Sequence, residues 1–198
     1  MQLERHRGGP IACERPPDIV TTRLLLRCLL PETIGAGLLG DRKAVEDHLG
    51  ATVPIDLLRD TTVLRYADAQ LATDRKYLPW SARAIVLRNS LEMVGHIRFH
   101  SRPDPEYLHP YARNAVELGY AVFPAHRNLG YAFEAVSGAM HWARDTHDVR
   151  YFVASIAPGN IPSLALIAKL GFHKSGEHVD PEDGIEHIYL GEELPPRP

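Results

Sequence analysis

The segment Ala115–Val136, AVELGYAVFPAHRNLGYAFEAV, most constrains how this chain can fold. Its first half alternates apolar side chains with a period of two, the pattern of a β-strand with one buried face; these are Val116, Leu118, Tyr120 and Val122. Pro124 ends the strand, because proline has no amide hydrogen to donate to a neighbouring strand. Beyond a short loop, Ala125–Leu129, small apolar residues recur at helical spacing: Ala132, Ala135, Val136, Ala139 and Ala143. The segment therefore predicts a strand, a tight loop and a helix, with Gly130 at the junction.

A junction of this kind can bind an anion. The first amide groups of a helix have no acceptor within the helix, and the helix dipole makes that end partly positive. Gly130 has no Cβ, so a phosphate could approach the backbone, and Arg127 adds a positive charge. The loop therefore predicts a phosphate or pyrophosphate site over residues 128–133. The alternative is that Gly130 only permits the turn, since the segment has neither the GxGxxG pattern nor the lysine of a P-loop.

Three parts of the sequence resemble the GCN5-related N-acetyltransferases (GNAT). RNLGYA is similar to their acyl-CoA pyrophosphate loop, Q/R-x-x-G-x-G/A, and the run GYAVFPAHRNLGYAFEAV resembles the branch that includes the ribosomal-protein N-terminal acetyltransferases. The segment Ala154–Phe172, ASIAPGNIPSLALIAKLGF, resembles a strand, an Asn-x-x-Ser helix opening and a K-x-GF ending. TTRLLLRCLLPE, Thr21–Glu32, resembles the first strand of the family. Together these matches span roughly Val20 to Leu190.

The resemblance implies an α+β fold with three α/β/α layers and a mixed, mostly antiparallel sheet. Its fourth and fifth strands would splay apart, so that acetyl-CoA, the acyl donor, could lie between them. A primary amine of a protein N-terminus, an amino acid or a small molecule would attack the thioester directly. The cofactor-binding residues that the resemblance implies are Tyr120, Ala121, Val122, Arg127, Asn128, Leu129, Gly130, Tyr131, Ala132, Phe133 and Asn160.

Glu117 is the leading candidate for the base that deprotonates the amine. It is the one carboxylate on the central strand, and similar enzymes often use a glutamate near this position. The alternative is a solvent-facing residue on the polar side of the strand. Glu134 and His126 are weaker candidates, and both are expected at the surface.

The leaving thiolate has no obvious acid. Many relatives carry a tyrosine four residues before the glycine of the Gly-Phe pair, where this chain has Ile167. Ser163, which aligns with a serine of the ribosomal-protein branch, could hydrogen-bond the sulfur or cap its helix. Asn160 could bind the amide chain of the cofactor or cap the same helix. A domain that binds acyl-CoA without turnover therefore remains the alternative function, and a structural or interaction protein that binds no CoA is a second.

Aromatic and acidic side chains that suit a cationic amine lie in segments expected to flank the acceptor: Tyr66, Asp68, Asp74, Tyr77, Trp80 and Tyr107. Most of them are expected to be packed or solvated residues. The sequence therefore leaves the acceptor open.

Composition excludes several classes of function. The 198 residues are of ordinary size for one domain, and 22 basic against 25 acidic side chains leave no positive excess for nucleic-acid binding. No apolar run has the length of a membrane span, and no apolar segment follows the charged N-terminus. Cys13 and Cys28 lack metal-site spacing and indicate reduced thiols in the cytoplasm. His96 and His100 lie in an expected strand, about 13 Å apart, so no metal site is predicted. A homodimer is the default from similar proteins, although no segment specifies an interface.

The chain is expected to consist of an arm (1–19), one domain (20–192) and a tail (193–198). Expected strands cover 20–30, 81–88, 92–100, 115–122, 151–156, 173–177 and 186–190. Expected helices cover 31–40, with 41–49 as a continuation, 131–145 and 162–170. Short helices and loops are expected over 50–79, and the long loop over 101–113 could cover a site.

Overall fold

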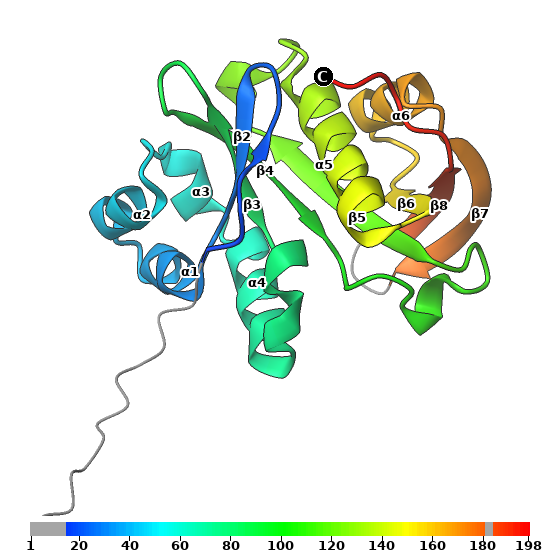
Figure 1. Ribbon diagram of the computed structural model, residues 1–198, viewed down its shortest axis with the longest axis horizontal. Helices are drawn as coiled ribbons and strands as arrows, with labels where there is room; N and C mark the ends of the chain where they lie inside the picture. The colour runs from blue at the N-terminus through cyan, green and yellow to red at the C-terminus, as the bar shows by residue number, and fades with distance from the viewer. Residues whose placement is uncertain (1–14, 181–183) are drawn as a thin grey trace, which may run out of the picture.

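One mixed sheet, with the strand order β1-β2-β3-β4-β5-β6-β8-β7, forms the centre of the protein (Figure 1). The computed structural model describes residues 15–180 and 184–198. Within them the strands are β1 Ile19–Val20, β2 Leu24–Cys28, β3 Arg83–Leu87, β4 Met93–Phe99, β5 Ala115–Val122, β6 Tyr151–Ile156, β7 His173–Asp180 and β8 Gly184–Gly191. Neighbouring strands are antiparallel, except that β5 and β6 are parallel.

Helices cover both faces of this sheet. The α-helices are α1 Pro31–Leu38, α2 Arg42–Leu49, α3 Ile55–Arg59, α4 Thr62–Thr73, α5 Tyr131–His147 and α6 Ile161–Lys169, and 3₁₀ turns cover η1 Arg75–Trp80, η2 Glu106–Leu108 and η3 Pro124–His126. Strand β3 shows the division, because Ala84 and Val86 pack into the core with α1–α4, whereas Ile85 packs into the core with α5 and α6. The predicted three-layer α/β/α arrangement is confirmed.

The predicted separation of two strands is also confirmed. Parallel pairing of β5 and β6 covers three residue pairs and ends at Glu117 and Val153. Beyond that point β5 continues along β4 as far as Val122, and β6 continues along β8 as far as Ile156. The two strands therefore part in the middle of the sheet and leave a gap beside residues 118–122.

The prediction of one strand over residues 20–30 is wrong. The chain reverses between β1 and β2, where the Thr21 amide donates to the Leu24 carbonyl at 3.0 Å. The reversal is held by Glu134 of α5, which accepts a hydrogen bond from the Thr21 hydroxyl at 2.7 Å. A contact between residues more than a hundred positions apart thus decides where the strand begins.

Other elements lie close to their predicted positions. The second helix starts after a break, as expected, because Asp41 caps α2 by accepting from the Ala44 amide at 3.0 Å. Helix α5 buries the predicted small-residue face and ends at His147, two residues later than expected. Helix α4 is twelve residues long, although only short helices were expected there. The link between the last two expected strands falls partly outside the described residues, and Cys13 and most of the expected arm lie outside them.

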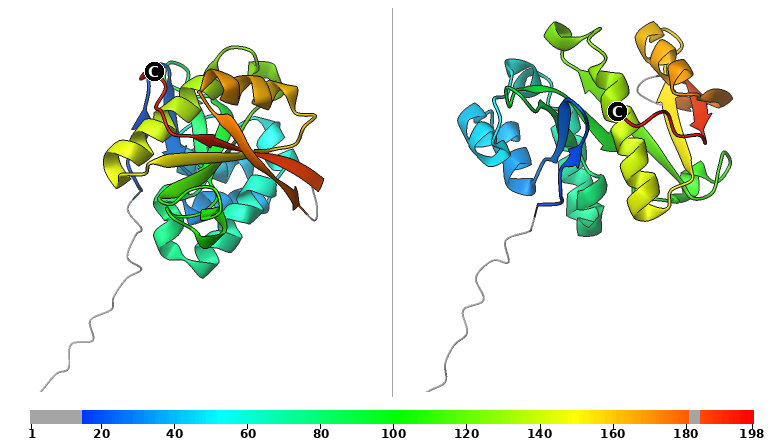
Figure 2. Two further views of the ribbon diagram at one scale, coloured as in Figure 1. Left: turned by 90° about the vertical axis from the view of Figure 1, so that its right-hand side faces the viewer. Right: turned by 45° about the horizontal axis from the view of Figure 1, so that its top comes forward.

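The C-terminal tail packs against α5 (Figure 2, right). The Ser137 hydroxyl donates to the Pro196 carbonyl at 3.0 Å, and His141 Nε2 lies 2.8 Å from the Pro195 carbonyl. Arg197 forms an ion pair with Asp145 at 2.7 Å. Within the described part of the chain, no helix is long and apolar enough to cross a membrane, and no group of three metal-ligating side chains gathers.

Candidate active site

Glu117 lies at the point where β5 and β6 separate. Its side chain is buried, with 6% of the residue exposed, so the alternative of a solvent-facing residue is wrong. The Ser155 hydroxyl on β6 donates to Oε1 at 2.5 Å, and His100 Nδ1, just after β4, lies 3.5 Å from Oε2. Two neighbouring strands thus each direct one polar side chain at the same carboxylate.

Strand pairing explains how His100 reaches Glu117. The His100 amide donates to the Glu117 carbonyl at 2.8 Å, so the two side chains lie side by side on one face of the sheet. Two residues further along β5 is Gly119, where an added Cβ would lie 2.8 Å from His100 Nε2. The glycine therefore leaves room for the imidazole. Tyr66 of α4 donates to the His100 carbonyl at 2.7 Å and fixes this part of the backbone.

These contacts make Glu117 a carboxylate at neutral pH. Burial alone would raise its pKa, but hydrogen bonds from His100, Ser155 and Tyr107 outweigh burial, and the pKa of Glu117 lies below its ordinary value. Burial, together with the negative charge of Glu117, raises the pKa of Tyr107, which therefore remains a neutral donor. Tyr107 belongs to the loop between β4 and β5, which contributes to the site as expected.

The face of β4 beside this cluster carries one permanent positive charge. The Arg98 guanidinium lies 3.7 Å from the centroid of the Tyr66 ring. Burial, with a smaller contribution from Arg98, lowers the pKa of His96 to about 4, so His96 is neutral at pH 7. The cluster therefore combines an ionised carboxylate with a half-buried cation and neutral aromatic donors.

The loop between β5 and α5 has the geometry of an anion cradle. Asn128 and Gly130 both have left-handed backbones, with φ of 62° and 81°. The first hydrogen bond of helix α5 runs from the Glu134 amide to the Gly130 carbonyl at 3.1 Å. The amides of residues 131–133 therefore have no acceptor within the helix. Arg127 donates through Nε to the Val122 carbonyl at 3.0 Å, which fixes the loop to the end of β5.

The amides beside the gap point in alternate directions. Because the Glu117 carbonyl and the Phe123 amide bond to β4, alternation along the strand also directs the Ala121 amide toward β4. The amides of Tyr120 and Val122 are directed toward the gap instead. Two of the three predicted backbone donors can therefore reach a group that lies there.

Glu134 is part of the framework of the cradle. It was expected at the helix surface, but it is 6% exposed. Its carboxylate accepts from the Thr21 hydroxyl and from the Arg23 amide and Nε, both of the latter at 2.6 Å. Arg23 also donates to the Leu129 carbonyl at 3.0 Å, and its guanidinium lies 4.7 Å from the centroid of the Tyr131 ring. Glu134 thus fixes an arginine beside the cradle. His126, also expected at the surface, is half-buried and lies 3.4 Å from Glu92.

Helix α6 borders the far side of the gap. Asn160 caps it by accepting from the Ser163 amide at 3.3 Å, so the cap that was considered for Ser163 belongs to Asn160. The Ser163 side chain lies next to the Tyr120 hydroxyl and lowers its pKa, whereas burial, the larger effect, raises it. Ile167 is 1% exposed and lies in the core.

The aromatic residues expected to flank an acceptor divide into two groups. Tyr66 and Tyr107 lie beside Glu117 and His100, whereas Tyr77 and Trp80 are buried in the core. Two acidic residues complete the set: Asp74 pairs with Arg102 at 2.6 Å, and Asp68 is exposed.

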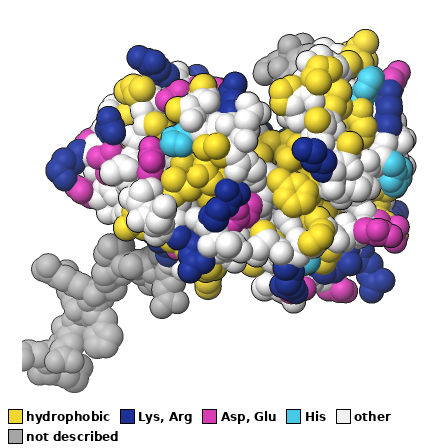
Figure 3. Space-filling view, turned by 90° about the horizontal axis from the view of Figure 1, so that it is seen from above, with side chains coloured by type: hydrophobic (Ala, Val, Ile, Leu, Met, Phe, Trp, Pro, Cys, Tyr) yellow, Lys and Arg dark blue, Asp and Glu magenta, His cyan; other side chains and the backbone are white. Residues whose placement is uncertain are grey.

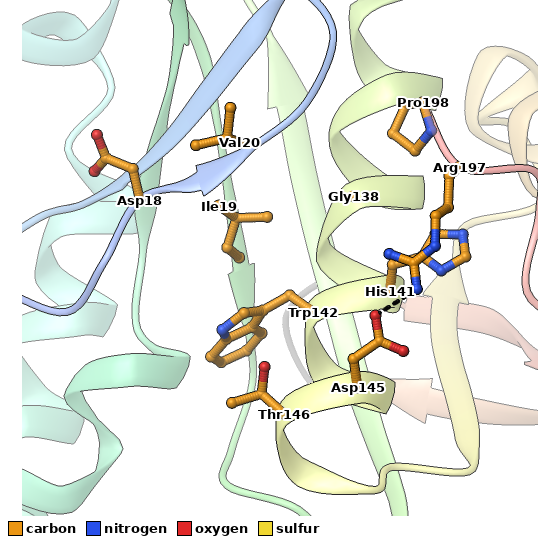
Figure 4. A pocket seen from close by; sticks show the side chains of 10 residues that line it. All are labelled: Asp18, Ile19, Val20, Gly138, His141, Trp142, Asp145, Thr146, Arg197 and Pro198. Atoms are coloured by element: carbon orange, nitrogen blue, oxygen red, sulfur yellow. Dashed lines mark hydrogen bonds and ion pairs between the residues drawn. The ribbon is translucent and has the colours of Figure 1, made fainter.

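The surface at the end of the molecule where β5 meets α5 is hollowed between its two halves, and hydrophobic side chains gather along the hollow (Figure 3). A cavity of about 460 Å³ beside the cradle is lined by Thr22, Arg23, Leu87, Arg88, Asn89 and Tyr131. Another, of about 350 Å³, lies between β1, α5 and the tail, where Arg197 and Asp145 meet (Figure 4). The lining of that second cavity shares no residue with the Glu117 cluster or the cradle.

Comparison with known proteins identifies the family. The model of the acetyltransferase (GNAT) domain matches residues 23–173. The chain belongs to the GNAT family. Among curated relatives, the uncharacterized N-acetyltransferase YjdG of Bacillus subtilis is 32% identical over 97 residues, 48% of this chain and 54% of YjdG. The uncharacterized N-acetyltransferase YnaD of the same organism is 26% identical over 92 residues, 46% and 49% of the two chains. The alignments thus span about half the length of these relatives.

Solved structures share the GNAT fold. An acetyltransferase from Agrobacterium tumefaciens has a TM-score of 0.60 at 21% identity, over 94% of this chain and 100% of that one. The ribosomal-protein-S5-alanine acetyltransferase of Vibrio fischeri has a TM-score of 0.61 at 15% identity, over 91% and 100% of the chains. Mycobacterium smegmatis RimJ, solved with CoA-disulfide, has a TM-score of 0.57 at 17% identity, over 90% and 86%.

Sequence reasoning missed three participants in this arrangement. His100 was considered only as a metal ligand, although pairing of the two predicted strands on either side of residues 101–113 could have placed it beside Glu117. Ser155 lay within a recognised motif, but its contact depends on the register of the β5–β6 pair. Arg98 was overlooked because an arginine in a strand is typically solvated.

Proposed function

We propose that this protein transfers an acetyl group from acetyl-CoA to a primary amine by direct attack. The observation that carries the proposal is Glu117, a buried carboxylate with a lowered pKa, placed where β5 and β6 part in a GNAT domain. A base held where the two strands part would lie next to an acetyl group bound in the gap. We assign the reaction to the cytoplasm, where thiols such as that of the buried Cys28 stay reduced.

The cofactor would be held mainly by backbone groups. The amides of residues 128–133, with Arg127 beside them, suit the pyrophosphate. Because Gly130 has no side chain, the pyrophosphate could approach these amides closely. The Tyr120 and Val122 amides face the gap and suit the pantetheine and the thioester oxygen. Asn160 would bind the amide chain only in addition to its role as the cap of α6. Arg23 and Arg88 line the cavity next to the cradle and add positive charge there.

Glu117 would accept the proton that the amine loses. Its carboxylate is ionised at neutral pH, which a base requires, and its hydrogen bonds fix the orientation of both oxygens. His100 is the more exposed partner, with 26% of its side chain exposed against 8% for Glu117. It therefore connects the buried carboxylate with solvent. Tyr107 presents an aromatic ring on the same side, which suits a cationic amine, whereas the Tyr66 ring already stacks with Arg98.

The names of structural neighbours guide the choice of the first acceptor to test. Structural neighbours are named for acetylation of ribosomal-protein serine and alanine. An N-terminal amine of a protein is therefore the first acceptor to test, ahead of free amino acids and small amines. A short peptide with an N-terminal serine or alanine presents the same group.

Calorimetric titration tests cofactor binding first. Acetyl-CoA and free CoA should bind wild-type protein with micromolar affinity, and Gly130→Glu should abolish binding because its side chain fills the cradle. Gly171→Glu is the matched control, because Gly171 has the same left-handed backbone, φ of 82°, with no atom within 4 Å of an added Cβ. Equal affinity in wild type and Gly130→Glu would refute the cradle.

Release of CoA thiol in the presence of amines tests turnover. Peptides with N-terminal serine or alanine, free amino acids and polyamines are compared at equal concentration with acetyl-CoA. Thiol release that depends on one acceptor class supports the transferase. Binding of CoA without release for any amine would favour the alternative of an acyl-CoA-binding domain without turnover.

A further inference from the structure

Tyr120 lies on the part of β5 that borders the gap and carries a buried hydroxyl. The residue follows the last β5–β6 pair by three positions and lies opposite Ile97 of β4. Its ring packs against the core that includes α5 and α6. Of the residues that the structure describes, none meets the hydroxyl oxygen in hydrogen-bond geometry, although the Ser163 side chain lies next to it.

This hydroxyl has no structural explanation. The ring alone would fill the core, and phenylalanine would fill it equally well. A buried donor without a partner costs free energy, so such a group in a folded protein calls for a separate reason. The position of the oxygen suggests one, because Tyr120 and Ser163 approach each other from the two sides of the gap.

We infer that the Tyr120 hydroxyl donates a hydrogen bond to the sulfur of CoA as it leaves, with Ser163 as a second donor. The inference rests on the proposed function. In the step concerned, a bond forms between the amine nitrogen and the acetyl carbon, and the bond between that carbon and sulfur breaks. The electron pair of the broken bond stays on sulfur, where the phenol and the serine hydroxyl hold the thiolate. The proton lost by the amine goes to Glu117 and through His100 to solvent, so charge and atoms balance.

The chemistry of the phenol suits this role. Burial raises the pKa of Tyr120, so the hydroxyl keeps its proton throughout the working range of pH. A group that stays protonated can stabilise an anion by donating a hydrogen bond, and such a bond is strong where water is excluded. The assignment also explains how the chain dispenses with an acid at Ile167, which is buried and apolar.

Tyr120→Phe tests the inference, with Tyr189→Phe as the matched control. Tyr189 of β8 is another partly buried tyrosine that packs against the same core, away from the gap. We expect Tyr120→Phe to lower kcat by at least about 10-fold, with the KM for acetyl-CoA within about 2-fold of wild type. Its melting temperature should be unchanged or higher, because the substitution removes an unpartnered buried group. Tyr189→Phe should leave kcat unchanged.

A binding experiment isolates the sulfur contact. Free CoA and desulfo-CoA, which lacks the sulfur, are titrated at pH 8.5, where about half of a typical thiol is ionised. Wild type should prefer CoA, and in Tyr120→Phe this preference should shrink, with the contact from Ser163 remaining. An unchanged preference, an unchanged kcat or a lowered melting temperature in Tyr120→Phe would overturn the inference. Absence of CoA binding and turnover in wild type would instead refute the proposed function.

Discussion

The Ser155 hydroxyl lies 2.5 Å from Glu117 Oε1 and joins β6 to β5 just beyond their last backbone pair. Where the two strands stop sharing backbone hydrogen bonds, a side-chain bond continues the connection. The bond has two consequences: it limits how far the sheet opens, and it helps to keep the carboxylate ionised. The same contact therefore links the shape of the gap to the chemistry of the base.

Replacing Ser155 with alanine should shift the pH dependence of catalysis. The hydrogen bond from Ser155 lowers the pKa of Glu117, so its loss raises that pKa. Because the base must be ionised, the acid limb of the kcat/KM profile should move to higher pH. Little change is expected above pH 7. Profiles from pH 4 to 9 for wild type and Ser155→Ala check this, and coincident acid limbs would show that Glu117 does not titrate in the reaction.

Gly119→Ala should impair catalysis more than stability. The added Cβ would lie 2.8 Å from His100 Nε2, which is the far end of a flexible side chain. The imidazole can therefore move away at small cost in folding, but it then leaves Glu117. We expect kcat to fall by about 10-fold, with a change of less than about 1 kcal/mol in the free energy of unfolding. Gly35→Ala, in open space on α1, is the control; a normal kcat in Gly119→Ala would separate His100 from the reaction.

Glu134→Gln should destabilise the fold in a pH-dependent way. The carboxylate accepts three hydrogen bonds. In glutamine an NH2 group replaces one of its oxygens and cannot accept from Arg23 Nε, so a loss of about 2 kcal/mol is expected at pH 7. Burial raises the pKa of Glu134, but the hydrogen bonds from Thr21 and Arg23 lower it by more. The pKa of Glu134 in the folded protein therefore lies below the ordinary value of 4.5. A lowered folded-state pKa gives stability that is fully present above 4.5 and is lost as the pH falls through the folded value.

Urea unfolding at pH 7 and pH 4 measures this difference. The difference in the free energy of unfolding between wild type and Glu134→Gln should be smaller at the lower pH. Glu177→Gln removes an exposed carboxylate paired with Lys174 at 3.2 Å and should cost less than about 1 kcal/mol at either pH. A difference in the free energy of unfolding that does not change with pH would mean that Glu134 stabilises the fold through packing alone.

Asn160 offers a comparison between two helix caps. Asn160 caps α6 and Asp41 caps α2, each through one side-chain oxygen. Alanine at either position should cost about 1 kcal/mol of stability. If Asn160 also contacts the cofactor, only Asn160→Ala should raise the Kd for CoA, by about 5-fold or more. Equal CoA affinity in both variants would leave Asn160 with capping alone.

The sequence predicted those elements that are determined by the pattern of neighbouring residues. The period-two run of β5 and the small-residue face of α5 identify a strand, a loop and a helix without any distant contact, and Gly130 lies in the left-handed conformation that the junction requires. The prediction fails where contacts between residues far apart in the sequence determine the structure. The turn at Thr21 depends on Glu134, and residues 20–30 therefore look like one strand.

The candidate site likewise depends on contacts between residues far apart in the sequence. Glu117 stood out because it is a carboxylate on the central strand. Its burial and its lowered pKa come from His100 and Ser155, which reach it only through the pairing of β5 with its two neighbours. The separation of β5 from β6 is a property of the assembled sheet, and only the family resemblance could suggest it in advance.

The most direct test of the account measures CoA affinity and turnover together in Glu117→Gln. The substitution keeps the shape of the side chain and removes the base. We expect the Kd for CoA to stay within about 2-fold of wild type and kcat for the best acceptor to fall by about 100-fold or more. A kcat close to that of wild type, in a variant that binds CoA normally, would contradict the assignment of Glu117 as the base.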